Sequence, residues 1–229
     1  MKTYHNDPAI KAKYIARVKA HRLIDELIQG TGWENGKGCA VGCTLDKYQH
    51  DQYPVEIGVT EGLARLEDHI FEALPPEDAI LWPEQFLSAI AEGIDERKLE
   101  IALDQFQIFW LERQKTQINA EKYPQVITAI DQTIALLNRA VSGDEPSKDE
   151  WSAAESAAES AAWSAAESVA RSAARSAAWS AARSAARSAA RSAAWSAAES
   201  AARSAAESAA RNEAKAKRDW LLDALAALK

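Results

Sequence analysis

The sequence has few of the residues that interrupt or cross-link a chain. It holds 2 cysteines, 7 prolines and 9 glycines in 229 residues, and neither glycine nor proline follows Pro146. Two cysteines are too few for a disulfide framework, and the chain does not open with the apolar stretch of an export signal. We therefore expect a cytoplasmic protein in which Cys39 and Cys43 are free thiols.

Long hydrophobic runs are also missing, because no stretch approaches the roughly 18 uninterrupted apolar residues of a membrane span. Residues 151–229 carry 11 Lys and Arg against 8 Asp and Glu, whereas residues 1–150 carry 16 against 26. The acidic first part argues against nucleic-acid binding, since phosphate contacts need clustered basic side chains. We thus expect neither a membrane nor a nucleic acid as partner, and we predict no cofactor and no bound metal.

Helical periodicity is the main signal in residues 1–146, where apolar residues recur at intervals of three and four. A short helical turn is expected over Cys39–Leu45 and an extended linker over 55–59. Capping residues, prolines and glycines mark the other expected helices: from Asp7 to Gly30, from Thr60 to Pro75, from Pro83 to Gly93, over residues 95–118 and from Pro124 to Gly143. The predicted fold class is all-α, with one compact helical domain over residues 1–146.

A strict repeat follows this domain. From Trp151 to Ala210 the chain is fifteen copies of the unit x-Ser-Ala-Ala, in which Val169 is the one exception and x is Trp, Glu or Arg. Alanine is the best helix former, and Ser147 and Glu150 form a capping box just before the repeat. The sequence therefore predicts one long helix over residues 147–229 with an apolar C-terminal end.

The period of four residues exceeds the 3.6 residues of a helical turn, so the x positions advance about 40° per repeat. If such helices supercoil, the supercoil is expected to be right-handed. Tryptophans at x positions and the apolar end favour self-association through residues 151–229. In one possible register, the repeat helices of two copies pair antiparallel about a two-fold axis near Ala173. The predicted interface residues are Trp151, Trp163, Trp179, Trp195, Trp220, Leu221, Leu225 and Leu228. We expect the apolar end to dock on the N-terminal domain or on a second copy.

The segment Gly36–Thr44 carries the candidate chemistry, and three interpretations stay open. Cys39 could be a nucleophile at a helix N-terminus, with His50 or His21 as its base. Cys39 and Cys43 could instead bind a metal together with those histidines, although two cysteines four residues apart are not the usual zinc spacing. The plainest alternative is two small buried hydrophobic side chains, the commonest role of a free cysteine.

Several segments resemble a family of uncharacterised bacterial and phage proteins whose tails are rich in alanine. The similar segments are Ala20-His21-Arg22, Asn35 to Thr44 and Leu63 to Glu72, within residues 14–93, and the repeat itself. The resemblance implies no activity. In relatives the position of Asp46 is often histidine, so a catalytic role of that position would not carry over.

From these patterns we expect a structural or interaction protein, with a helical head and a self-associating repeat helix. One alternative is a small cysteine-dependent enzyme that uses Cys39. A second alternative is an ice-binding or surface-binding helix, because alanine-rich helices with regular hydroxyl groups can present flat faces. Charged residues and tryptophans wind round the helix and interrupt such flat faces. They therefore favour an interaction protein over an ice-binding or surface-binding helix.

Overall fold

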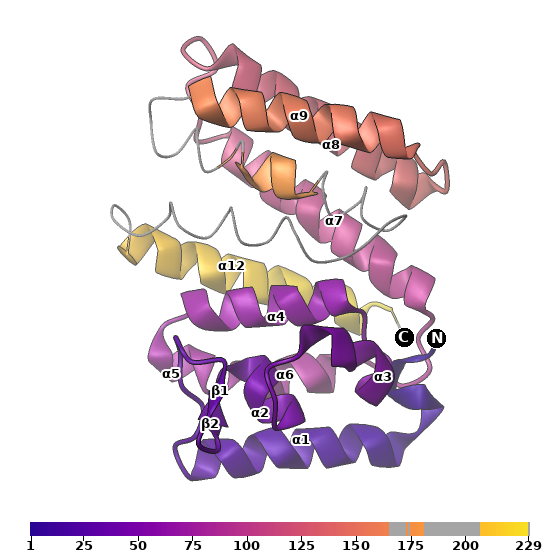
Figure 1. The fold of residues 1–229 in the computed structure, drawn as a ribbon, viewed down its shortest axis with the longest axis vertical. Coiled ribbons are helices and arrows are strands. Elements are labelled where there is room, and N and C mark those ends of the chain that lie inside the picture. Colours follow the sequence, from indigo (N-terminus) through magenta and orange to yellow (C-terminus); the bar gives the residue numbers. More distant parts are fainter. Residues whose placement is uncertain (165–172, 174, 181–206, 229) are drawn as a thin grey trace. The chain divides into compact units, whose positions relative to one another are not determined.

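The computed structural model describes residues 1–164, 173, 175–180 and 207–228 (Figure 1). These residues are mainly helical and include one two-stranded sheet. Two compact units divide the chain: residues 1–103 with 206–229, and residues 104–205. Among the described residues, no helix is both long and apolar enough to cross a membrane.

The predicted single helix over residues 147–229 is wrong. The described part of this region contains α9 (Lys148–Ser164), a helical segment over 175–180, and α12 (Glu207–Ala226). Helix α9 belongs to the second unit and α12 to the first. The units therefore do not follow the expected boundary at residue 146.

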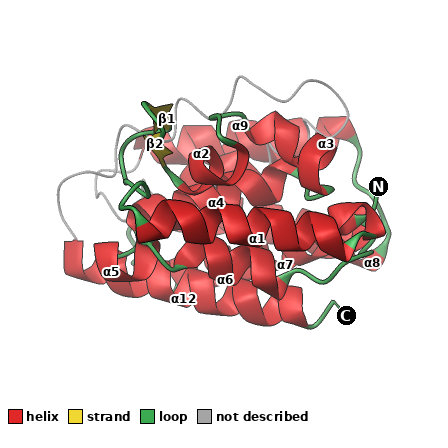
Figure 2. Cartoon of the chain, turned by 90° about the horizontal axis from the view of Figure 1, so that it is seen from below, coloured by secondary structure: helices red, strands yellow, loops and turns green. Residues whose placement is uncertain are grey.

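The first unit is built from short helices around α4 (Glu61–Ala73) and α6 (Trp82–Ala89). Both helices contact α12, and α1 (Pro8–Leu23) contacts α6 (Figure 2). The other described helices of this unit are 3-10 helices over Thr3–Asn6 and His50–Gln52, α2 (Ala40–Leu45), α3 (Tyr53–Ile57), α5 (Pro76–Ala79) and the start of α7 (Glu96–Lys115). Tyr53, Trp82 and Phe86 are fully buried in this unit.

Helix α1 begins as predicted and ends earlier than predicted. The Asp7 carboxylate accepts a hydrogen bond from the amide of Ala9 at 2.8 Å, and Pro8 occupies the first turn. The helix ends at Leu23, because Asp25 adopts a positive φ of 56°. The following residues then turn toward Gly38, whose amide donates to the carbonyl of Glu26 at 2.9 Å.

Two local elements differ from the sequence predictions. Strands β1 (Trp33–Glu34) and β2 (Lys37–Gly38) form a hairpin, so the fold is not purely α. The Asn35-Gly36 turn explains it, because both residues have positive φ, as tight hairpin turns require. Residues 55–57, expected to be extended, lie in helix α3, which has Pro54 in its first turn and ends at Gly58.

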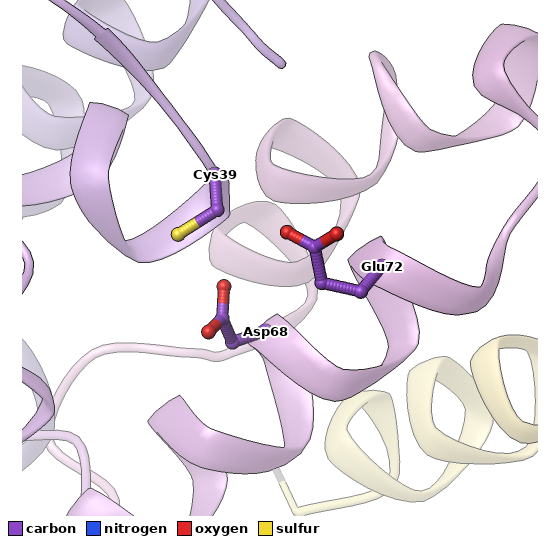
Figure 3. Close-up of side chains that lie close together, drawn as sticks. All are labelled: Cys39, Asp68 and Glu72. Carbon is purple, nitrogen blue, oxygen red and sulfur yellow. The ribbon is translucent and has the colours of Figure 1, made fainter. Parts of the chain in front are cut away.

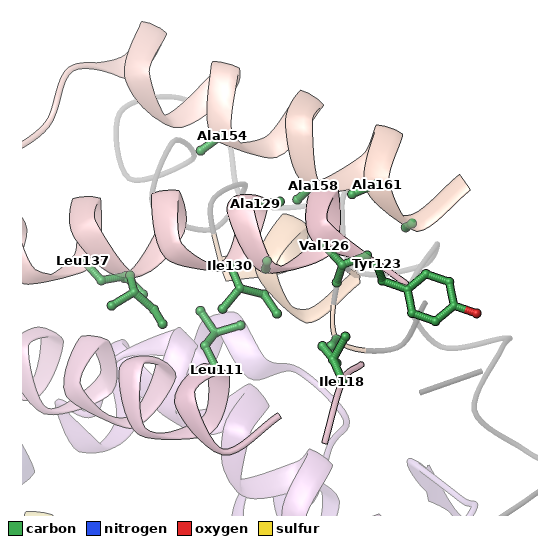
Figure 4. Packing of buried hydrophobic residues seen from close by; sticks show 14 of the residues in the cluster. Leu111, Ile118, Tyr123, Val126, Ala129, Ile130, Leu137, Ala154, Ala158 and Ala161 are labelled. Atoms are coloured by element: carbon green, nitrogen blue, oxygen red, sulfur yellow. The ribbon is translucent and has the colours of Figure 1, made fainter. Parts of the chain in front are cut away.

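The second unit contains the end of α7, helix α8 (Pro124–Ser142) and α9. Its core combines Leu111 and Ile118 with buried residues of α8 and the alanines of α9 (Figure 4). The side chains of Ile130 and Leu137 point toward Leu111, while Ala129 lies on the α9 side of α8. The predicted capping box begins α9, since the amide of Ser147 donates to the Glu150 carboxylate at 2.7 Å. Trp151, predicted to face a partner, is 1% exposed and packs in this core.

The buried face of the repeat changes from one unit to the next. Within α9 the buried Ala154 and Ala158 are the fourth residues of their units, and the buried Ala161 is the third. Within the segment 175–180 the buried Ala177 is the third residue of its unit and the buried Ser180 the second. This drift is the consequence of a period of four on a helix with 3.6 residues per turn. In one straight helix the charged x residues would rotate onto the partner side after about five repeats, which disfavours continuous packing along one neighbour.

The apolar C-terminal end docks on the first unit of its own chain. Leu221 and Leu225 in α12 are fully buried, Leu228 and Trp220 are partly buried, and α12 contacts α4 and α6. The expected docking on the N-terminal domain is therefore confirmed. Trp179 is partly buried, while Trp195 and the side chain of Trp163 lie outside the described residues.

Candidate functional site

Three glycines hold the segment before α2 in close contact with that helix. A Cβ atom at Gly38 or Gly42 would lie 2.2 or 2.0 Å from the carbonyl oxygen of Gly32. The same oxygen accepts a hydrogen bond from the amide of Cys39 at 3.1 Å. Because no other residue fits at Gly38 and Gly42, the glycine pattern serves to fix Cys39 at the N-terminus of α2.

Cys39 lies beside two carboxylates of α4. Its Sγ atom and one carboxylate oxygen each of Asp68 and Glu72 all lie within 4.8 Å of one another (Figure 3). Asp68 and Glu72 are four residues apart and therefore share one face of the helix. Cys39 is 1% exposed, and burial, followed by the negative charge of Asp68, raises the pKa of its thiol.

Asp68 is the centre of a buried polar group. Its Oδ2 atom accepts hydrogen bonds from His50 Nε2 at 3.1 Å and from the Tyr48 hydroxyl at 3.0 Å. Its other oxygen, Oδ1, is buried and has no hydrogen-bond partner among the described residues. Glu72 lies at the surface, where its Oε2 atom accepts from the amide of Gly30 at 2.7 Å.

The histidines predicted to serve Cys39 contact carboxylates instead. His50 contacts Asp68, and His21 lies between Glu26 at 2.6 Å and Asp46 at 3.0 Å. Cys39 is 1% exposed, and among the described residues no hydrogen bond joins its thiol to a histidine. The arrangement does not favour a thiol activated by histidine.

Cys43 occupies a different environment one turn further along α2. Its thiol donates to the carbonyl oxygens of Gly38 at 3.4 Å and Glu26 at 3.5 Å, and burial raises its pKa to about 12. Both cysteines are free thiols. Because its sulfur is occupied by backbone carbonyls, Cys43 has a structural role of the kind the plainest interpretation predicts.

The acidic residues of α4 are the part of the site that the sequence did not indicate. Residues 65–69 carry charges of both signs, a pattern typical of a helix surface, yet Glu67 is fully buried and accepts a hydrogen bond from the Tyr53 hydroxyl at 2.5 Å. Burial raises the pKa of Glu67 well above its ordinary value. The spacing of Asp68 and Glu72 was visible in the sequence, but their neighbour Cys39 comes from a distant segment.

Comparison with known proteins gives no further identification. No protein-family model, no curated protein and no solved structure matches this chain. Its function must therefore be inferred from its own residues and geometry.

Proposed function

We propose that this protein is an interaction protein, in which the alanine-rich repeat provides surfaces for helix packing through which copies of the chain associate. The observation that carries the proposal is the packing of α9 on α8. Ala154, Ala158 and Ala161 are at most 5% exposed and lie on the side of α8 that carries Ala129 (Figure 4). The repeat thus already acts as a helix-packing surface within the chain.

A second surface of the repeat is left open beside this contact. A groove of about 540 Å³ runs between α8 and α9. Small repeat residues form one wall, and α8 forms the other with uncharged side chains; the lining residues are Pro124, Gln125, Thr128, Ala129, Gln132, Ala157, Ser160 and Ala161. Small, uncharged walls suit another helix with small side chains, because its backbone can approach closely without burying an unpaired charge.

We infer that the occupant of this groove is a repeat helix from a second copy. The chain holds fifteen nearly identical units, so every copy carries both the groove and the small side chains that fit it. A register centred on Ala173 is not favoured, since Ala173 is 1% exposed in the core of its own unit. The groove of α8 and α9 replaces that register as the proposed contact.

Sedimentation velocity of the full chain over a wide range of concentration tests the proposal. Ser160 and Ser152 occupy the same place in their units and are both exposed, but only Ser160 lines the groove. We expect Ser160→Arg to weaken self-association at least about tenfold, a change of about 1.4 kcal/mol. Ser152→Arg is the matched control and should associate like the unchanged protein. A chain that stays monomeric throughout, or equal effects of both variants, would contradict the proposal.

A further inference from the structure

The geometry points to a binding site for a zinc-like divalent cation at Cys39, Asp68 and Glu72, and we propose it as a second property of this protein, independent of self-association. The three side chains approach one another from two elements that are distant in sequence (Figure 3). They offer one sulfur and two carboxylate oxygens. That mixed set suits zinc or cobalt, whereas magnesium and calcium bind oxygen alone.

The buried carboxylate is the observation that separates this cluster from an ordinary acidic surface. Asp68 is 6% exposed, and its Oδ1 atom meets no hydrogen-bond geometry among the described residues. The carboxylate interacts with the neighbouring thiol of Cys39, whose proton a bound cation would replace. Figure 3 shows one carboxylate oxygen of Asp68 directed toward the space between Cys39 and Glu72. A buried carboxylate oxygen without a full hydrogen bond is unfavourable, and a bound cation would supply a strong interaction at this place.

The opposite side of Asp68 is arranged as the outer layer of a metal site usually is. His50 and Tyr48 both donate to Oδ2 and so fix the orientation of the carboxylate. Cys39 is fixed in turn by the close packing of Gly38 and Gly42. Two of the three ligands are therefore held in place before any cation arrives.

Glu72 supplies the adjustable ligand. In a tetrahedral zinc site the ligand atoms lie about 3.5 Å apart, as follows from metal–ligand distances near 2.0–2.3 Å. The three atoms here lie within 4.8 Å, so the cluster must contract by about 1 Å. The surface position of Glu72 allows that movement, and it leaves the fourth coordination position on the solvent side. On binding, the cation replaces the thiol proton of Cys39, which is released to solvent.

Titration of the metal-free full chain with Co²⁺ under reducing conditions tests the site. We expect one Co²⁺ per chain, visible-region absorption typical of tetrahedral cobalt, and a near-ultraviolet sulfur-to-cobalt band. Release of about one proton per cation should accompany binding at a pH where the thiol is protonated. Zn²⁺ should displace the cobalt, whereas Mg²⁺ should not.

Matched variants decide which residues bind. Cys39→Ala should abolish the sulfur-to-cobalt band, while Cys43→Ala, which removes the other buried thiol of α2, should keep it. Glu72→Gln changes a surface residue and leaves the packing intact, so it tests the site even if Cys39→Ala fails to fold. We expect Glu72→Gln to weaken binding by at least about tenfold, comparable to the loss of an outer-layer partner. No cobalt binding, or loss of the band in Cys43→Ala alone, would overturn the proposal.

Discussion

Helices α9 and α12 both come from the alanine-rich part of the chain, and they pack in different ways. Helix α9 contacts its unit through alanines and one large side chain, Trp151. Helix α12 buries Leu221, Leu225 and the charged Lys217. A buried alanine removes little apolar area and can contact almost any apolar surface.

Large and charged side chains specify one place of contact. In α12, Arg218 and Lys215 both pair with Asp78 of α5, at 3.0 and 2.9 Å. These pairs and the spacing of the two leucines fit α12 to one surface of the first unit. The repeat therefore provides a general packing surface, whereas α12 at the end of the chain binds one specific surface.

The strongest test of this difference is a leucine truncation in α12. Leu221 is fully buried and Leu222 only partly, although the two are neighbours on the same helix. We expect Leu221→Ala to reduce the free energy of unfolding by about 2–5 kcal/mol and to undock α12. Chemical denaturation and hydrogen exchange of α12 measure the effect. Leu222→Ala is the control, and an equal loss there would mean that α12 docks through another face.

The charged group in the α12 contact makes a second prediction, which concerns pH. Lys217 donates a hydrogen bond to His69 Nε2 at 3.2 Å, and burial lowers its pKa to about 8. The ordinary pKa of lysine is about 10.4, so between pH 8 and that value the unfolded chain binds more protons than the folded one. The contribution of Lys217 to stability should therefore rise with pH across this window, and the full cost of burying its charge should be present below pH 8. The buried thiols of Cys39 and Cys43, whose pKa values are raised, act in the opposite direction, so the effect of Lys217 must be measured as a difference between two proteins.

The size of this pH effect is on the order of 3 kcal/mol, and a methionine variant isolates it. Lys217→Met keeps most of the length of the side chain and removes the charge together with the hydrogen bond to His69. We expect the variant to be more stable at pH 7.5 and to lose most of the difference between pH 7.5 and pH 9.5. Denaturation of both proteins at both pH values is the measurement. Parallel pH dependence in the two proteins would show that Lys217 is not the group that titrates.

The smallest effect tests the alanine contact of α9. Ala158 is fully buried and Ala153 is exposed on the same helix. We expect Ala158→Leu to lower the free energy of unfolding by about 1–3 kcal/mol, because the larger side chain overpacks the core. Ala153→Leu should change the free energy of unfolding by less than about 0.5 kcal/mol, because this position is exposed. Thermal or chemical unfolding of the two variants compares them, and the reverse order would require a different rotation of α9 on α8.

Local signals in the sequence predicted many element boundaries. The cap at Asp7, the capping box at Ser147 and the helix from Pro124 to Gly143 depend only on neighbouring residues, and the structure confirms them. Leu23 shows the limit of periodicity: it is apolar, close to a helical stripe, and 78% exposed. Residues 55–57 alternate like a strand, yet Pro54 and Gly58 define a short helix.

The sequence indicated only part of the candidate site: it pointed to Cys39 but not to the carboxylates beside it. Gly38, Cys39 and Gly42 form an unusual pattern in the sequence, and the structure explains the two glycines by the close approach of the Gly32 carbonyl oxygen. Asp68 and Glu72 belong to a helix that begins 22 residues after Cys39. Which helix meets a cysteine depends on the packing of the whole unit. Neither spacing nor composition of a single sequence contains that information.

The drift of the buried face also bears on how such a tract can change during evolution. Its unit is encoded by twelve nucleotides, and replication slippage would add or remove whole units. Each event would rotate the following residues by only about 40° and shift them by about 6 Å. Because Ala and Ser fill three of the four places, the face that becomes buried after such an event is still made mainly of small side chains. Tracts of different copy number can therefore keep a packable surface without compensating changes elsewhere.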